Sequence, residues 1–272
     1  MLRRGQALVV VLLILGIAVT VGLSVVSRSV TDVTVSTGEE ESAKALEAAE
    51  AGVERALGGV IAVDGPPVID NLQESSFNVT NTAVGDGSVY EVPNLLAAGD
   101  VATIQMDGFT GPPPYPNFVL CWENVIEAAD PAVEVMLYFR RGGVIGVGRQ
   151  GYDPNPVRLT GFLPDSMGNC PGGFSNYNFH RRFDLEDFGI TDLSTGEVGV
   201  PVLMRVRMLL NTVPQGIVLV VPSGNLPIQG SEIISTGQAG GSTQKLRVLQ
   251  TNPDLPMMFD TALFSGGSLT QP

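Results

Sequence analysis

The chain has 272 residues, of which 44% are hydrophobic and only 16% are charged, and its formal net charge is -13. The 33 glycines and 19 prolines follow no collagen-like period, so they exclude a large all-helical bundle and predict short strands, turns and loops. With 15 basic residues, two cysteines and one histidine, the composition argues against nucleic-acid binding, a structural zinc site and an iron–sulfur centre.

The N-terminus carries a membrane signal. Residues 1–5 form a short leader with Arg3 and Arg4, and the 22 residues from Gln6 to Ser27 have no charge. Roughly 20 apolar residues in a helix cross the ~30 Å hydrocarbon core of a membrane, and a removable secretory signal has a shorter apolar region. Arginines precede the run and glutamates follow it. We therefore predict a single span of the inner (cytoplasmic) membrane with the N-terminus inside.

The helix is expected to continue beyond the membrane. The stretch 28–57 contains no proline and becomes rich in alanine, glutamate, leucine and lysine, which favour helix. Glycines at 58 and 59 then suit a left-handed helix end. We predict one helix over residues 6–58, first apolar and then amphipathic. Its outer half has an apolar stripe that we expect to seat the following domain: Leu46, Ala49, Val53 and Leu57.

Three features occur together and in order here: a basic leader that ends in Gly5, an apolar helix that starts directly after it, and the segment ALEAAEAGVERAL at 45–57. This combination resembles the N-terminal region of type IV pilin-like proteins, most closely PilX-type minor pilins and the tip subunits of type II secretion pseudopili. The resemblance implies that a prepilin peptidase cuts after Gly5 and that Gln6 becomes a methylated N-terminus. It also implies assembly with other pilin-like subunits, at an inner-membrane assembly platform, into an extracellular filament.

One position departs from the pattern of repeating shaft subunits. Val10 stands where major pilins carry a glutamate near the start of the mature helix. A carboxylate in lipid is costly unless it is paired, and the minor and tip-type relatives commonly lack it. The resemblance therefore implies a minor or tip subunit with a structural or adhesive role. Two other classes stay open, namely a membrane-anchored cell-surface binding module that does not polymerise and a membrane-anchored hydrolase.

The remaining residues, 59–272, are predicted to form an extracytoplasmic β domain with long loops. Apolar residues alternate most clearly at 132–140 and 202–210, where Arg205 and Arg207 are expected to point away from the apolar face. Weaker strand candidates are 88–92, 101–106, 117–123, 144–149, 158–162, 178–184, 216–221, 232–236, 244–250 and 257–264. The predicted fold is α+β: a long N-terminal helix followed by an antiparallel all-β, sandwich-like domain. A split near residues 165–175 is the alternative to a single domain.

Cys121 and Cys170 are the two cysteines of the chain. Outside the membrane, an isolated pair favours a disulfide, which would close a loop of about 49 residues and stabilise the fold by a few kcal/mol. The alternative is two buried free thiols that act as small hydrophobes.

The sequence carries no recognisable catalytic motif, so we predict no enzyme activity, no cofactor and no resident metal. The single histidine, His180, is expected on a strand at the surface. The densest acidic stretch of the outer domain could offer oxygen ligands to calcium, but its spacing lacks the EF-hand pattern, so a solvated acidic loop is the favoured interpretation: Asp184, Glu186, Asp187 and Asp192. Aromatic residues in loop-rich stretches could anchor a glycan or protein partner, or could pack in the core: Tyr115, Trp122, Tyr152, Phe174, Tyr177 and Phe179.

Overall fold

The computed structural model describes residues 4–72, 74–111, 117–124, 130–155, 157–166 and 170–253, with only the backbone described for 4–8. The chain forms two compact units. The helix–sheet unit comprises residues 1–82 and 232–248, and the sandwich unit comprises residues 83–231 and 249–272. This division differs from the single domain that we expected over 59–272 and from the alternative split near 165–175. The predicted strand at 257–264 lies outside the described residues.

Helix α1 (Arg4–Leu57) is the long element that the sequence predicts. It contains no proline, and it ends where the glycine pair begins. The amide of Gly58 donates to the Glu54 carbonyl at 2.8 Å, and Gly59 has a φ of +74°. A left-handed residue at this place is the usual way to stop a helix, because it turns the chain away from the helix axis.

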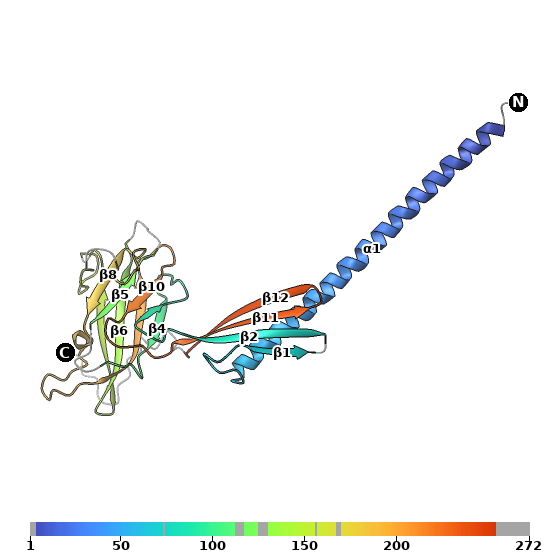
Figure 1. Ribbon diagram of the computed structural model, residues 1–272. Coiled ribbons are helices and arrows are strands. Elements are labelled where there is room, and N and C mark those ends of the chain that lie inside the picture. Colours follow the sequence, from blue (N-terminus) through green and yellow to red (C-terminus); the bar gives the residue numbers. More distant parts are fainter. Residues whose placement is uncertain are drawn as a thin grey trace, which may run out of the picture. The chain divides into compact units, whose positions relative to one another are not determined.

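The second half of α1 covers one face of a four-stranded sheet, as Figure 1 shows. The strands lie in the order β1 (Val68–Leu72), β2 (Ser75–Val84), β11 (Gly230–Ala239) and β12 (Ser242–Thr251). Helix and sheet share a small apolar core made of Ala48, Val53, Ala56, Ile61, Phe77, Val79 and Ile233. Neither β1 nor β2 was predicted. Polar residues occupy much of 68–84, and they weaken the alternating pattern that marks a strand.

Small residues let the helix approach the sheet closely. A Cβ atom on Gly237 of β11 would lie 2.0 Å from the Ala45 carbonyl oxygen, and one on Gly52 would lie 2.2 Å from the Ser235 hydroxyl. Such distances leave no room for larger side chains at the contact. The buried helix positions are accordingly Ala45, Ala48, Ala49, Gly52, Val53 and Ala56.

Two of the four predicted seating residues are therefore placed differently from the prediction. Ala49 and Val53 are buried against the sheet, but Leu46 and Leu57 are 39% and 46% exposed and lie on the side of α1 turned to solvent. At this contact the helix uses alanine and glycine to bring the backbones together, so the larger leucines do not fit between helix and sheet.

The sandwich unit contains two four-stranded sheets. The first has the order β3 (Val89–Glu91), β10 (Ile217–Val220), β5 (Phe118–Trp122) and β8 (Phe179–Phe183), and the second has the order β4 (Val101–Gln105), β9 (Val200–Leu209), β6 (Ala132–Arg141) and β7 (Val144–Tyr152). All recorded strand pairs in both sheets are antiparallel. The short 3-10 helix η1 (Leu185–Phe188) packs on β7. The inner faces of the two sheets meet in one core, which confirms the sandwich-like fold.

The clearest alternating segments form central strands of the second sheet. Val133, Val135, Leu137 and Phe139 of β6 share the core face as predicted. In β9 the core residues are Met204, Val206 and Met208, whereas Leu210 follows the strand with a φ of +64° and is partly exposed. Arg205 lies on the opposite face, as the alternation predicts, but it is buried. The predicted strand at 158–162 is instead a series of turns and bends.

Cys121 and Cys170 are joined by a disulfide, with their Cα atoms 5.8 Å apart. The bond ties the segment that begins at Cys170 to the outer face of β5. There the disulfide belongs to a second apolar cluster with Val119, Tyr177, Val218 and Val220. The first sheet of the sandwich therefore has apolar contacts on both faces.

Candidate membrane and assembly helix

The first half of α1 has no protein cover. Every described side chain from Val9 to Glu40 is exposed, including Leu12 at 62% and Leu23 at 65%. This is the one helix, among the described residues, that is long and apolar enough to cross a membrane. An apolar surface of this extent needs lipid or another protein against it, because it is unstable in water.

The length of this segment matches a bilayer. At 1.5 Å per residue the uncharged run from Gln6 to Ser27 spans about 33 Å, close to the ~30 Å hydrocarbon core. The first charges beyond it are Arg28 and Asp32, where a helix leaving the membrane would meet headgroups and water. The hydroxyl of Thr20, inside the run, donates to the Ile17 carbonyl at 2.9 Å. The hydroxyl is therefore satisfied within the helix and needs no water.

The predicted processing residues lie at the start of the same helix. Gly5 and Gln6 fall in the first turns of α1, and only their backbone is described. Val10 is exposed on this apolar surface. The exposed surface described here therefore presents only uncharged side chains from Val9 to Ser27.

Exposed ion pairs lie along the outer half of α1, and two of them reach residues at or beside the sheet. Lys44 contacts Glu40, one turn earlier at 2.9 Å, and Glu74, and Arg55 contacts Asp70 of β1. The hydrogen bond from Arg55 lowers the pKa of Asp70, and the hydrogen bond from Lys44 lowers the pKa of Glu74. All these groups are solvent-exposed, so their contribution to stability is small and depends on salt.

The acidic stretch of the sandwich unit is not gathered around one point. Asp184 caps η1 and accepts a hydrogen bond from Asn117 at 2.7 Å, while Asp192 accepts bonds from the backbone and hydroxyl of Ser194. No group of three His, Cys, Asp or Glu side chains within the described residues could hold a metal ion. The carboxylates shape local turns instead, and the remaining two, Glu186 and Asp187, lie in η1 itself.

The described aromatic residues among those singled out from the sequence are buried or partly buried, not exposed to solvent. Trp122, Tyr152 and Tyr177 are buried; the Trp122 indole donates to the Pro131 carbonyl at 2.8 Å, and the Tyr177 hydroxyl donates to Glu91 at 2.9 Å. Burial raises the pKa of Tyr152 and Tyr177. Phe174 and Phe179 are partly buried against the apolar clusters, and Tyr115 lies outside the described residues. His180 lies on β8, opposite Cys121 of β5, and is partly buried.

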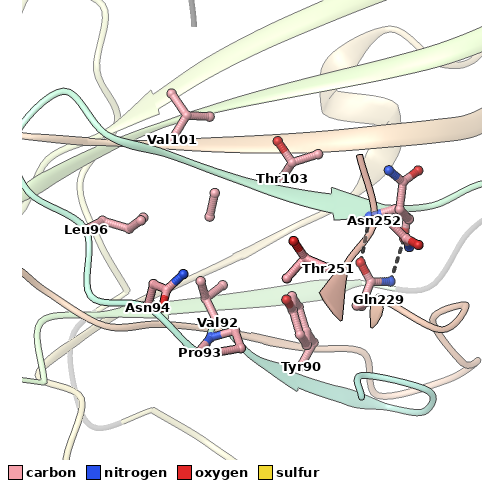
Figure 2. A pocket seen from close by; sticks show the side chains of 12 residues that line it. Tyr90, Val92, Pro93, Asn94, Leu96, Val101, Thr103, Gln229, Thr251 and Asn252 are labelled. Carbon is pink, nitrogen blue, oxygen red and sulfur yellow. Dashed lines mark hydrogen bonds between the residues drawn. The ribbon is translucent and has the colours of Figure 1, made fainter. Parts of the chain in front are cut away.

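A pocket of about 130 Å³ lies within the sandwich unit, between the edge strands β3 and β4. Figure 2 shows Tyr90 and Val92 on one side of it and Val101 and Thr103 on the other. The Gln229 side chain accepts from the Gln105 amide at 2.7 Å and donates to the Gln105 carbonyl at 3.0 Å, so it closes the edge of β4. None of the lining residues is charged, so the pocket offers no acid–base pair.

A comparison with known families assigns the helix. Residues 4–54 match the family model described as PilX N-terminal. The N-terminal region of this protein is PilX-like. The PilX-like region covers the whole exposed apolar segment and most of the part of α1 that packs on the sheet. No curated protein and no solved structure matches the chain.

The match lies entirely within α1. The matched residues include the exposed apolar segment that is long and apolar enough to cross a membrane. The match ends inside the helix at residue 54 and does not extend into the sandwich unit. The helix is thus the functional element for which the family and the structure agree.

Proposed function

We propose that the protein is a minor-pilin-type subunit that a prepilin peptidase cuts after Gly5 and that assembles into, or at the tip of, a type IV pilus-type filament. Before assembly, α1 spans the cytoplasmic membrane with its N-terminus inside. During assembly, contact with the helices of other subunits replaces the contact with lipid. The protein acts by assembly and not by catalysis.

The observation that carries this proposal is the uncovered helix. The segment from Val9 to Glu40 projects from the helix–sheet unit with every described side chain exposed, and the PilX N-terminal model matches this same segment. A plain membrane anchor needs only the apolar part up to Ser27. The exposed continuation to Glu40, with its charged residues, lies beyond the hydrocarbon core, where it is available to neighbouring subunits.

The absence of a carboxylate at Val10 supports a minor or tip position within the filament. A shaft helix that buries a charged side chain needs a partner for it in every repeat, because an unpaired charge in an apolar environment is expensive. This helix has no charged side chain at that position and needs no such partner. It can enter the assembly at one place without a matching charge on the next subunit.

The test is intact-mass spectrometry of the full chain from membranes, produced with and without the host prepilin peptidase. We expect a peptidase-dependent loss of residues 1–5, with or without one methyl group on Gln6. A Gly5→Val variant should stay uncut, while the matched Gly16→Val variant, which changes another glycine of α1, should be cut. An uncut wild-type chain would refute the proposal and favour the membrane-anchored binding module that does not polymerise.

A further inference from the structure

The pocket between β3 and β4 lies in the sandwich unit, where the edge strand of one sheet faces the edge strand of the other. Its volume is about 130 Å³. An engineered protein cavity of about 150 Å³ holds one benzene ring, so this pocket has room for a ligand group of about one six-membered ring. All the described residues that line the pocket belong to the sandwich unit.

One hydroxyl on the wall of this pocket is buried without a hydrogen bond. Tyr90 of β3 is 5% exposed, and its hydroxyl has no hydrogen-bond partner within the described part of the chain. Figure 2 shows its side chain pointing from β3 into the pocket. A Cβ atom on Gly85 would lie 2.6 Å from the Tyr90 ring, so close packing holds the ring from the other side. A buried tyrosine hydroxyl normally has a partner, and here the pocket is the side from which a partner can come.

The other polar groups of the pocket wall can both donate and accept. Asn94 and Thr251 line the pocket, and their side chains make no hydrogen bond among the described residues. The side-chain amide of Asn252 donates to the Ile228 carbonyl at 3.0 Å, which leaves its side-chain oxygen as an acceptor. The rest of the wall is largely aliphatic, and it includes Val92, Pro93 and Leu96. The pocket therefore offers hydroxyl and amide groups beside an apolar surface.

Two features argue against other classes of ligand. None of the described lining residues is charged, and the chain has a net charge of -13, so an anionic ligand would meet no opposite charge here. An extended peptide would bind by adding a strand to the edge of β4. The Gln229 side chain already makes both hydrogen bonds to the Gln105 backbone that such a strand would make, so it blocks strand addition at this end of β4.

We propose that this pocket binds one neutral sugar residue of a glycan. A sugar ring carries several hydroxyl groups that each donate and accept, so it can satisfy the Tyr90 and Thr251 hydroxyls and the Asn94 amide together. The C–H groups of the ring form small apolar patches that fit the aliphatic part of the wall. The inference goes beyond the proposed function, because the pocket lies in the sandwich unit and its contacts do not involve α1.

The test is saturation-transfer NMR of the full chain in micelles of a zwitterionic detergent that has no sugar headgroup. The probes are the methyl glycosides of glucose, galactose, mannose and N-acetylglucosamine, each added alone. We expect at least one of them to bind with a Kd on the order of 1 mM, as its small size permits. Methyl glucuronide, the anionic counterpart of methyl glucoside, should give no saturation transfer. Binding of none of the neutral glycosides, or equal binding of methyl glucuronide, overturns the proposal.

Two variants place the binding in this pocket. Tyr90→Phe removes only the hydroxyl and should weaken binding of the sugar by about five- to tenfold, the usual effect of one lost hydrogen bond. Asn94→Ala changes an exposed residue that the fold tolerates, and it should weaken binding by a similar factor. The matched control is Tyr152→Phe, which removes a buried tyrosine hydroxyl of the same unit outside the pocket and should leave binding unchanged.

Equal affinity in the wild type, Tyr90→Phe and Asn94→Ala would overturn the assignment of the pocket. The midpoint of urea unfolding shows that each variant is folded. A chain that keeps residues 1–5 should bind the sugar as well as a processed chain does, because the leader lies in the other unit. Loss of sugar binding therefore refutes this inference alone, and failure of processing refutes the proposed function alone.

Discussion

Replacing Gly237 by alanine tests the close packing of helix and sheet. The new Cβ atom would lie 2.0 Å from the Ala45 carbonyl oxygen and 2.5 Å from the Ala49 amide nitrogen, far inside normal contact. Both atoms belong to the helix backbone, so no side-chain rotation relieves the clash, and helix and strand must move apart. Overpacking of a core costs about 1–3 kcal/mol, and we expect the upper end here, about 3 kcal/mol.

The loss can be read by hydrogen exchange of the full chain in detergent micelles. Amides of β2 and β11 should exchange about 100-fold faster in Gly237→Ala, because each 1.4 kcal/mol of opening free energy changes the rate tenfold. Amides of β6 in the sandwich unit serve as the internal reference. The matched control is Gly241→Ala, whose Cβ would meet nothing closer than 3.5 Å. Equal exchange in the two variants would refute the reasoning that backbone contact, and not side-chain area, holds α1 to the sheet.

Three further predictions concern other contacts. Replacing both Cys121 and Cys170 by alanine should destabilise the sandwich unit by about 3–4 kcal/mol, read as a lower midpoint in urea; an unchanged midpoint would contradict a stabilising role for the bond. The pKa of Asp70 is lowered by Arg55, so this contact stabilises the helix–sheet unit above pH 3.8, the ordinary pKa of the group, and is lost as the pH falls further. Protection of β1 amides should therefore drop with acid in the wild type and vary less in Asp70→Asn. Leu15→Arg should reduce membrane insertion, measured as the carbonate-extractable fraction, and Val63→Arg, an exposed change outside the helix, should leave it unchanged.

The sequence predicts the helix and the sandwich strands well, because both rest on strong periodic signals. The uncharged run and the glycine pair at 58 and 59 define α1 closely, and the alternation in β6 correctly identifies its core face. The strands β1 and β2 are missed because residues such as Asp70, Asn71 and Asn78 interrupt the apolar alternation. In these strands, pairing with the neighbouring strands and contact with α1 override the weak local preference.

The residues of α1 that contact the sheet were predicted only in part, for a different reason. A stripe of apolar residues at helical spacing predicts a buried face, and the larger side chains Leu46 and Leu57 are its natural members. The true contact face is one step around the helix, at Ala45, Ala48 and Gly52, where small residues gain close backbone approach instead of side-chain area. Gly237, which leaves room for the helix backbone to come this close to β11, is far from these residues in the sequence. The helix alone carries no signal for it.

Side-chain size differs between the two halves of α1, and this difference affects how the helix can leave the membrane for contact with other helices. Alanine and glycine dominate the part that packs on its own sheet, whereas valine, leucine and isoleucine dominate the uncovered part from Val9 to Val26. Large aliphatic side chains contact lipid tails and the aliphatic side chains of other helices about equally well, so leaving the bilayer for a bundle of such helices is not opposed by the hydrophobic effect. Departure from the membrane therefore depends on what replaces the lipid contact. The apolar half of α1 needs a complete cover of neighbouring helices, and a single subunit extracted alone would expose about 20 apolar residues to water.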